Sequence, residues 1–249
     1  MIVQSLAHYY DAMLKRGAIS APGWGPASIS YAICLDLDGN VLRLISTVQE
    51  VAIGNKTKIK PQIMTVPKKL RRTSDITANF LWDNSAYILG VGKDGEGDEE
   101  KAQKNIRRFE AAVQLHHNIL DGVDSPAARA ILKYFDTWKP ENAKDAEALK
   151  DVYDDVTKGA NIVFRVDGEF AYKNEAICTA WLEYQLGIGY AKMQCLVTGR
   201  YDEIPNTHPM INGIKGVRSN NTTLISFKHP AFWSYGHKQN MNAPIGKHA

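Results

Sequence analysis

The stretch ISYAICLDLDGNVLRLISTV, which spans Ile29–Val48, carries the clearest signal for a β-sheet in this chain. Aliphatic and β-branched residues fill the runs Ile29–Asp36 and Val41–Val48, and the short segment Asp38-Gly39-Asn40 lies between them. Two such runs joined by a short turn that contains glycine are typical of a β-hairpin. The sequence therefore predicts two antiparallel strands here.

Two aspartates of this turn, Asp36 and Asp38, also suggest carboxylate chemistry of the kind found in phosphatases and calcium loops. A calcium loop needs a longer series of oxygen ligands, and none follows. Aspartate is common in turns because its side chain bonds the nearby backbone. We therefore interpret both residues as turn-formers.

Helical and extended patterns alternate along the rest of the chain. Helices are predicted from apolar residues at helical spacing, and the segments are Met1–Arg16, Glu99–Leu120, Ser125–Trp138, Asn142–Val156 and Tyr172–Leu186. Strands are predicted at Ile63–Val66, at Ile162–Val166 before an Asp167-Gly168 turn, at Met193–Thr198 and at Leu224–Phe227. Together they predict an α+β fold, in which helices pack on a mixed or antiparallel sheet and residues 99–157 form a helical region.

Composition limits the classes of protein to which the chain can belong. With 249 residues, of which 44% are hydrophobic, it can bury a large core and fits one large domain or two small ones. The cysteines, Cys34, Cys178 and Cys195, are odd in number and far apart, which disfavours a disulfide framework or a zinc site. No apolar run reaches the ~18 residues of a membrane span. We expect a cytoplasmic protein without a membrane partner.

Positive charge is concentrated between Gly54 and Asn84, in GNKTKIKPQIMTVPKKLRRTSDITANFLWDN. Seven basic residues lie there before the first acidic one: Lys56, Lys58, Lys60, Lys68, Lys69, Arg71 and Arg72. Because the net charge of the chain is only +3, the remainder is balanced or slightly acidic. The run predicts a loop that projects from the fold and binds a polyanion through its phosphates. The alternative is a solvated loop that only aids solubility.

Polar side chains that follow the basic run are suited to reading DNA. Thr73, Ser74, Asn79 and Asn84 can donate hydrogen bonds to base edges or to the sugar-phosphate backbone. The two asparagines can equally be turn-formers that bond their own backbone.

Catalytic patterns are largely missing from the sequence. The seven histidines show no metal-binding spacing, and no phosphate loop or nucleophile motif is present. Cys195 and His208 could form a nucleophile and base, but Cys195 lies in an apolar run where an inert thiol is commoner. We expect a protein that is not an enzyme and uses neither a metal nor a cofactor.

Several ordered motifs resemble the large subunit of the type I-C CRISPR Cascade complex. They are RRTSDITANFLWDNSAYILG (Arg71–Gly90), CLVTG (Cys195–Gly199), HPMINGIKG (His208–Gly216), LISFKHPAFWSYG (Leu224–Gly236) and QNMNAP (Gln239–Pro244). The N-terminal helix with Tyr9-Tyr10 and the Ile29–Val48 hairpin fit as well, so the similarity covers essentially the whole chain.

The resemblance implies an RNA-guided surveillance complex for antiviral defence, in which this subunit recognises the protospacer-adjacent motif on duplex DNA and helps to start strand separation. Its partners would be the other Cascade subunits with their guide RNA, the target duplex and a recruited helicase-nuclease. The family chain continues into a helical C-terminal domain, whereas this sequence ends at Ala249. We therefore expect the N-terminal domain of a large subunit in truncated form. The alternative is a short homologue that occupies the place of the large subunit in Cascade as a decoy inhibitor.

Overall fold

The computed structural model describes residues 2–53, 56–70, 76–92, 95, 97–186, 191–208, 223–227 and 229–246. The chain forms two compact units. One comprises Ser20–Gln185, and the other comprises Met1–Ile19 with Leu186–Ala249. The two units are described separately below.

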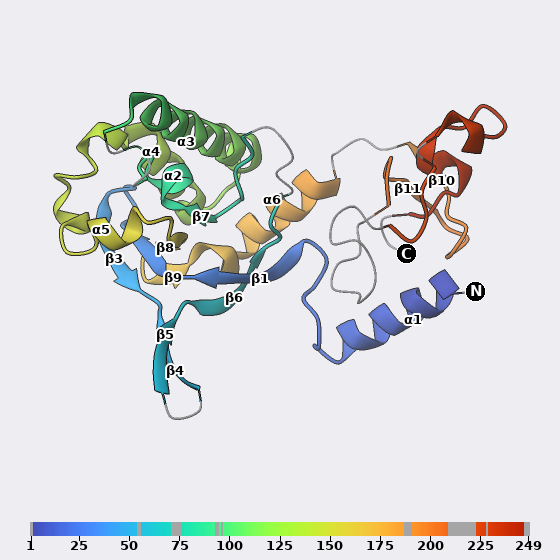
Figure 1. The fold of residues 1–249 in the computed structure, drawn as a ribbon, viewed down its shortest axis with the longest axis horizontal. Helices are drawn as coiled ribbons and strands as arrows, with labels where there is room; N and C mark the ends of the chain where they lie inside the picture. The colour runs from blue at the N-terminus through green and yellow to red at the C-terminus, as the bar shows by residue number, and fades with distance from the viewer. Residues whose placement is uncertain are drawn as a thin grey trace. The chain divides into compact units, whose positions relative to one another are not determined.

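A five-stranded mixed sheet forms the centre of the Ser20–Gln185 unit (Figure 1). Its strand order is β3-β2-β8-β7, with β9 paired to β8. The strands are β2 (Tyr31–Leu35), β3 (Val41–Ser46), β7 (Trp82–Asn84), β8 (Asn161–Val166) and β9 (Glu169–Phe170). β2 and β3 pair antiparallel, so the predicted hairpin is confirmed, while β2 and β8 pair parallel. The α+β fold with a mixed sheet is thus confirmed.

Turn chemistry explains the LDLDGN segment as predicted. The Asp36 carboxylate accepts hydrogen bonds from the backbone N–H groups of Asp38 (2.9 Å) and Asn40 (2.8 Å). The hydrogen bonds from Asn40 hold the pKa of Asp36 below its ordinary value. Gly39 adopts a φ of +79°, a left-handed conformation that glycine reaches without the steric penalty of a Cβ atom.

Helices cover one face of the sheet (Figure 1). The helices of this unit are α2 (Ser85–Ile88), α3 (Glu99–Leu120), α4 (Pro126–Thr137), α5 (Tyr153–Val156) and α6 (Glu175–Leu186). Ser125 caps α4 by accepting a hydrogen bond from the backbone N–H of Ala128, as the Ser125-Pro126 pair predicted. The buried side chains of these helices join Phe164 of β8 in one large hydrophobic cluster.

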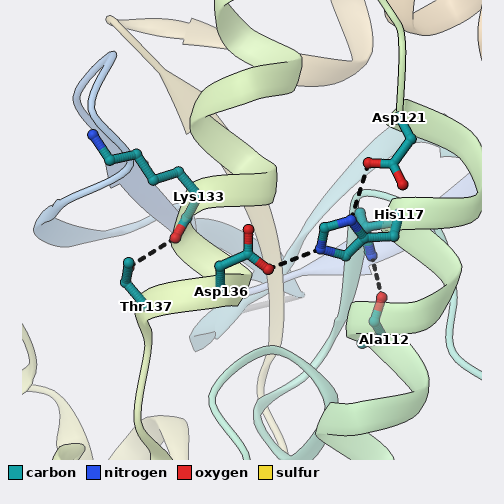
Figure 2. A network of polar contacts seen from close by, with 7 residues as sticks. Ala112, His117, Asp121, Lys133, Asp136 and Thr137 are labelled. Carbon is teal, nitrogen blue, oxygen red and sulfur yellow. Dashed lines mark hydrogen bonds and ion pairs between the residues drawn. The ribbon is translucent and has the colours of Figure 1, made fainter.

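His117 joins α3 to α4 through two carboxylates (Figure 2). Its Nδ1 lies 3.0 Å from Asp121 and its Nε2 lies 2.9 Å from Asp136 of α4. Partial burial opposes the charged ring, yet the hydrogen bonds to both carboxylates leave the pKa of His117 above its ordinary value. Protonated His117 therefore stabilises the contact between the two helices.

The opposite face of the sheet carries a separate two-stranded sheet. It consists of β1 (Trp24–Ile29) and β6 (Gln62–Pro67), which pair antiparallel. Val163 of β8 packs against this second layer, whereas its neighbour Phe164 packs against the helices. Because both faces of β8 are buried, its sequence is a nearly continuous apolar run rather than an alternating one.

A third pair of strands, β4 (Gln49–Ile53) and β5 (Lys56–Lys60), forms a β-ribbon that projects from the rest of this unit (Figure 1). The predicted basic loop is therefore partly wrong in its local structure, because its first half is a paired strand. Pro61, which has no backbone N–H, separates β5 from β6 at the point where the partner strand changes from β4 to β1.

One predicted helix, Asn142–Val156, is wrong. This segment contains the 3₁₀ turn η3 (Glu147–Leu149), follows directly on η2 (Pro140–Asn142), and is α-helical only in α5. Ala143 and Leu149 are both fully buried, but they would lie about 120° apart around a continuous helix. The chain leaves the helical conformation at Ala146, whose ψ is 119°, and this allows both side chains to reach the core.

The other unit contains α1 (Ile2–Lys15) and a short hairpin of β10 (Lys192–Gln194) and β11 (Tyr201–Glu203). α1 agrees with the predicted N-terminal helix. The predicted strand Met193–Thr198 is wrong beyond Gln194, because Cys195–Gly199 forms a turn closed by the Gly199 N–H donating to the Cys195 carbonyl. The predicted strand Leu224–Phe227 is also wrong, since its residues form a bend and irregular backbone. Two 3₁₀ turns, η5 (Pro230–Phe232) and η6 (Gln239–Asn242), follow. No described helix of either unit is both long and apolar enough to cross a bilayer.

Candidate nucleic-acid interface

The basic side chains that the structure describes lie on the surface along β5 and just after β6. Lys58 and Lys60 of β5 are exposed, and so are Lys68 and Lys69. β5 lies in the projecting ribbon and Lys68 and Lys69 follow β6, so these charges are spread over the surface instead of gathered at a single point. Cations spread in this way suit an extended polyanion better than a small anion.

None of these four lysines takes part in an ion pair within the described part of the chain. Lysines elsewhere do have carboxylate partners, such as Lys133 with Asp38 at 2.9 Å and Lys158 with Asp155 at 2.7 Å. Within the described residues, no carboxylate neutralises the charge of these four lysines.

The other predicted basic and polar residues are described only in part. The backbone of Lys56 pairs with Ile53 across the ribbon. Arg71, Arg72, Thr73 and Ser74 lie outside the described residues.

Asn79 lies inside the protein and binds its own chain. It is only 1% exposed, its Oδ1 accepts a hydrogen bond from the backbone N–H of Leu70 at 3.0 Å, and its own N–H donates to Asp83 at 2.8 Å. The side chain therefore anchors the end of the basic segment. We place it among the residues that hold the interface, which is the alternative that sequence reasoning left open.

Asn84 has a comparable local role. It is the N-cap of α2, and its Oδ1 accepts a hydrogen bond from the backbone N–H of Ala86 at 3.1 Å. The side chain is partly buried, and its Oδ1 is used to cap the helix.

Sequence reasoning missed two side chains that also support this region. The Trp82 indole N–H donates to the carbonyl of Pro67, at the end of β6, over 2.8 Å. The buried ring of His116 accepts a hydrogen bond at Nε2 from the Leu81 N–H at 3.0 Å. Leu81 has a φ of +62°, which is unusual for a residue with a Cβ atom. A buried indole N–H needs a hydrogen-bond acceptor, so a structural role for Trp82 could have been expected from the sequence. The identity of that acceptor, the Pro67 carbonyl, could not be read from the positions of the two residues in the chain.

Replacing Asn79 by alanine should lower the free energy of unfolding by about 1–3 kcal/mol, because the Leu70 N–H would lose its acceptor in a partly buried site. Urea denaturation measures this change. Asn118→Ala is a matched control, because Asn118 is exposed and its side chain accepts a hydrogen bond from the Gln114 side chain on the helix surface; it should change stability by less than about 0.5 kcal/mol. Equal effects of the two substitutions would contradict the anchoring role.

The rival thiol site does not assemble in the described structure. Cys195 is 1% exposed, and its Sγ accepts hydrogen bonds from the backbone N–H groups of Val197 (3.4 Å) and Gly246 (3.3 Å). Burial opposes the thiolate, but these N–H donors leave the pKa of Cys195 below its ordinary value. His208 has a buried Nε2 without a hydrogen-bond partner, and no hydrogen bond joins it to Cys195 among the described residues. The two side chains therefore show no nucleophile–base geometry.

The chain matches a known protein family. Residues 6–249 match the family model described as CRISPR-associated protein (Cas_Csd1), which covers nearly the whole chain. A search of curated proteins finds no match.

Proposed function

Because the chain belongs to the Cas_Csd1 family of CRISPR-associated proteins, we propose that it is a non-catalytic DNA-recognition subunit of a type I-C Cascade surveillance complex. In this role it recognises the protospacer-adjacent motif on duplex DNA and helps to start strand separation. The guide RNA, held by other Cascade subunits, reads the rest of the target by base pairing, and a recruited helicase-nuclease cleaves it.

The observation that carries this proposal is the set of exposed lysines on β5 and after β6, none of which has a carboxylate partner among the described residues. Cations that bind phosphates gain affinity chiefly by releasing counterions from the nucleic acid. A lysine that already has a carboxylate partner offers less of this gain. The four lysines, which make no ion pair with a described residue, are therefore better suited to DNA contact than Lys133 and Lys158.

The shape of the β4–β5 ribbon supports the same assignment. Several DNA-binding proteins use β-strands as their contact element, so a projecting two-stranded ribbon is a suitable support for lysines that bind phosphates. In this proposal the lysines bind phosphates and fix the register of the subunit on the duplex. Thr73 and Ser74, which follow the basic run, remain the proposed readers of the motif.

The test uses the assembled complex with its guide RNA and duplexes that differ only in the candidate motif. Lys58→Ala combined with Lys60→Ala should weaken binding to every duplex alike and reduce the slope of log affinity against log salt by about 2, since each lost phosphate contact removes about 0.9. Titrations at about 50 and 200 mM salt give this slope. Lys68→Ala with Lys69→Ala tests the second pair in the same way.

Lys139→Ala combined with Lys144→Ala is the matched control. Both lysines are exposed, belong to the same unit and lack a recorded ion pair among the described residues, so the variant removes the same charge from another place. An equal loss of affinity in the control would show a nonspecific charge effect and remove the ribbon from the interface.

A cellular experiment tests the role of the subunit in defence. The chain should restore interference in a type I-C strain that lacks its large subunit. Failure to restore it, together with loss of interference when the chain is expressed in an intact strain, would replace the proposal with the decoy alternative.

A further inference from the structure

The two faces of the β4–β5 ribbon differ in charge. Partners in an antiparallel pair have their side chains on the same face, and successive residues of a strand alternate between faces. Lys58 is paired with Val51 and Lys60 with Gln49, so both lysines share one face. Lys56 takes the next alternate position of the strand, paired with Ile53.

The other face carries no basic residue among its paired positions. It consists of the pairs Glu50–Ile59 and Ala52–Thr57. Ile59 is 70% exposed, so this face presents aliphatic surface and a carboxylate to solvent. A polyanion therefore meets attraction on one face and Glu50 on the other.

We infer that the ribbon docks on the sugar-phosphate backbone of the target duplex through the Lys58–Lys60 face alone. This inference rests on the proposed function and adds to it the face that makes the contact. Two residues of a strand advance about 7 Å, so lysines on one face form a straight row. A straight row on one face follows a single DNA strand, whereas charges on both faces would be needed to contact the two strands that border a groove.

Moving one charge between the faces tests the inference at constant composition. Thr57 and Lys58 are adjacent, exposed and on opposite faces, so Thr57→Lys combined with Lys58→Thr leaves the net charge unchanged. Lys58→Thr alone should reduce the affinity of the assembled complex for duplex DNA and lower the salt slope by about 0.9. The double variant should lose as much as this single variant, and Thr57→Lys alone should not tighten binding.

Restoration of the original affinity by the double variant would overturn the inference, because charge number rather than face would then decide. Hydrogen exchange across β4 and β5 verifies that each variant keeps the ribbon. Assembly of the complex on its guide RNA is measured in parallel, and a defect there instead of in duplex binding would also overturn the inference.

The experiment separates this inference from the proposed function. If Lys58→Thr has no effect while Lys68→Ala with Lys69→Ala weakens motif-dependent binding, the ribbon face is wrong and the proposed function stands. If the unmodified complex shows no preference for any motif, the proposed function itself fails.

Discussion

Replacing Gly39 by alanine is expected to lower the free energy of unfolding by about 2–5 kcal/mol. Gly39 lies in the β2–β3 turn with a φ of +79°, which is unfavourable for a residue with a Cβ atom. An added Cβ would also lie 2.6 Å from the Ala130 carbonyl oxygen and 2.9 Å from the Tyr134 nitrogen, both in α4. Since these are backbone atoms of a helix, the contact cannot be relieved by rotating a side chain.

Gly168→Ala separates the two causes. Gly168 has a φ of +81° in the β8–β9 turn, but an added Cβ would meet no atom within 4 Å. Its replacement should lower the unfolding free energy by only about 1–2 kcal/mol. Denaturant unfolding of both variants gives the difference, and equal values would show that close packing of α4 on the turn contributes nothing.

A second large effect is expected from His116 as the pH falls. Burial lowers the pKa of His116 to about 4, compared with about 6.5 in the unfolded chain. The unfolded chain therefore binds the proton first, so stability is unchanged above pH 6.5 and decreases as the pH falls from about 6.5 to 4. This one residue should account for a loss of about 3 kcal/mol.

The physical reason lies in the two hydrogen bonds of the His116 ring. Nε2 accepts from the Leu81 N–H, so the proton of the neutral ring is on Nδ1, which lies 2.7 Å from the Ala112 carbonyl. A second proton on Nε2 would face the Leu81 N–H directly. The aromatic rings of Phe80, Phe135 and Phe164 surround the ring and offer no counter-charge.

Two variants test this assignment through stability measured between pH 7 and 4. His116→Gln should be less stable at pH 7 and lose less stability on acidification, because glutamine does not titrate. His117→Gln should keep the acid loss, because the raised pKa of His117 means that its stabilisation is complete below pH 6.5 and disappears only as the pH rises through that higher value. Identical acid losses in the original protein and in His116→Gln would contradict the assignment.

Local chemistry made part of the fold predictable from sequence. The β2–β3 hairpin, the Ser125 cap and the Asp167-Gly168 turn each depend on residues that are close in the chain. The parallel pairing of β2 with β8 joins Tyr31 to Ile162, and no local pattern indicates such a contact. The prediction of a helix at Asn142–Val156 was wrong because tertiary packing also decides the conformation there. Burial of both Ala143 and Leu149 outweighs the helix propensity of the segment.

The basic residues of the candidate interface could be predicted from the sequence, but the secondary structure that carries them could not. The lysines of β5 could be named from composition, but KTKIK has lysine at three of its five positions and only Ile59 as an apolar residue, so it lacks the apolar face of a half-buried strand. Its pairing with β4 was therefore not evident. Asn79 could be recognised as polar and near the basic run, whereas its burial depends on β7, α3 and the end of β6 meeting in space.

The β4–β5 ribbon can change in evolution without disturbing the core of the protein. The ribbon forms its own two-stranded sheet, and none of its described side chains contributes to either hydrophobic cluster. Substitutions on it leave the core packing intact, so most of them are tolerated without loss of folding. Changes in the length of the ribbon and on its Glu50–Ile59 face therefore leave both the core and the proposed lysine row intact. We expect related chains to diverge most at these positions and to keep basic residues on the Lys58–Lys60 face.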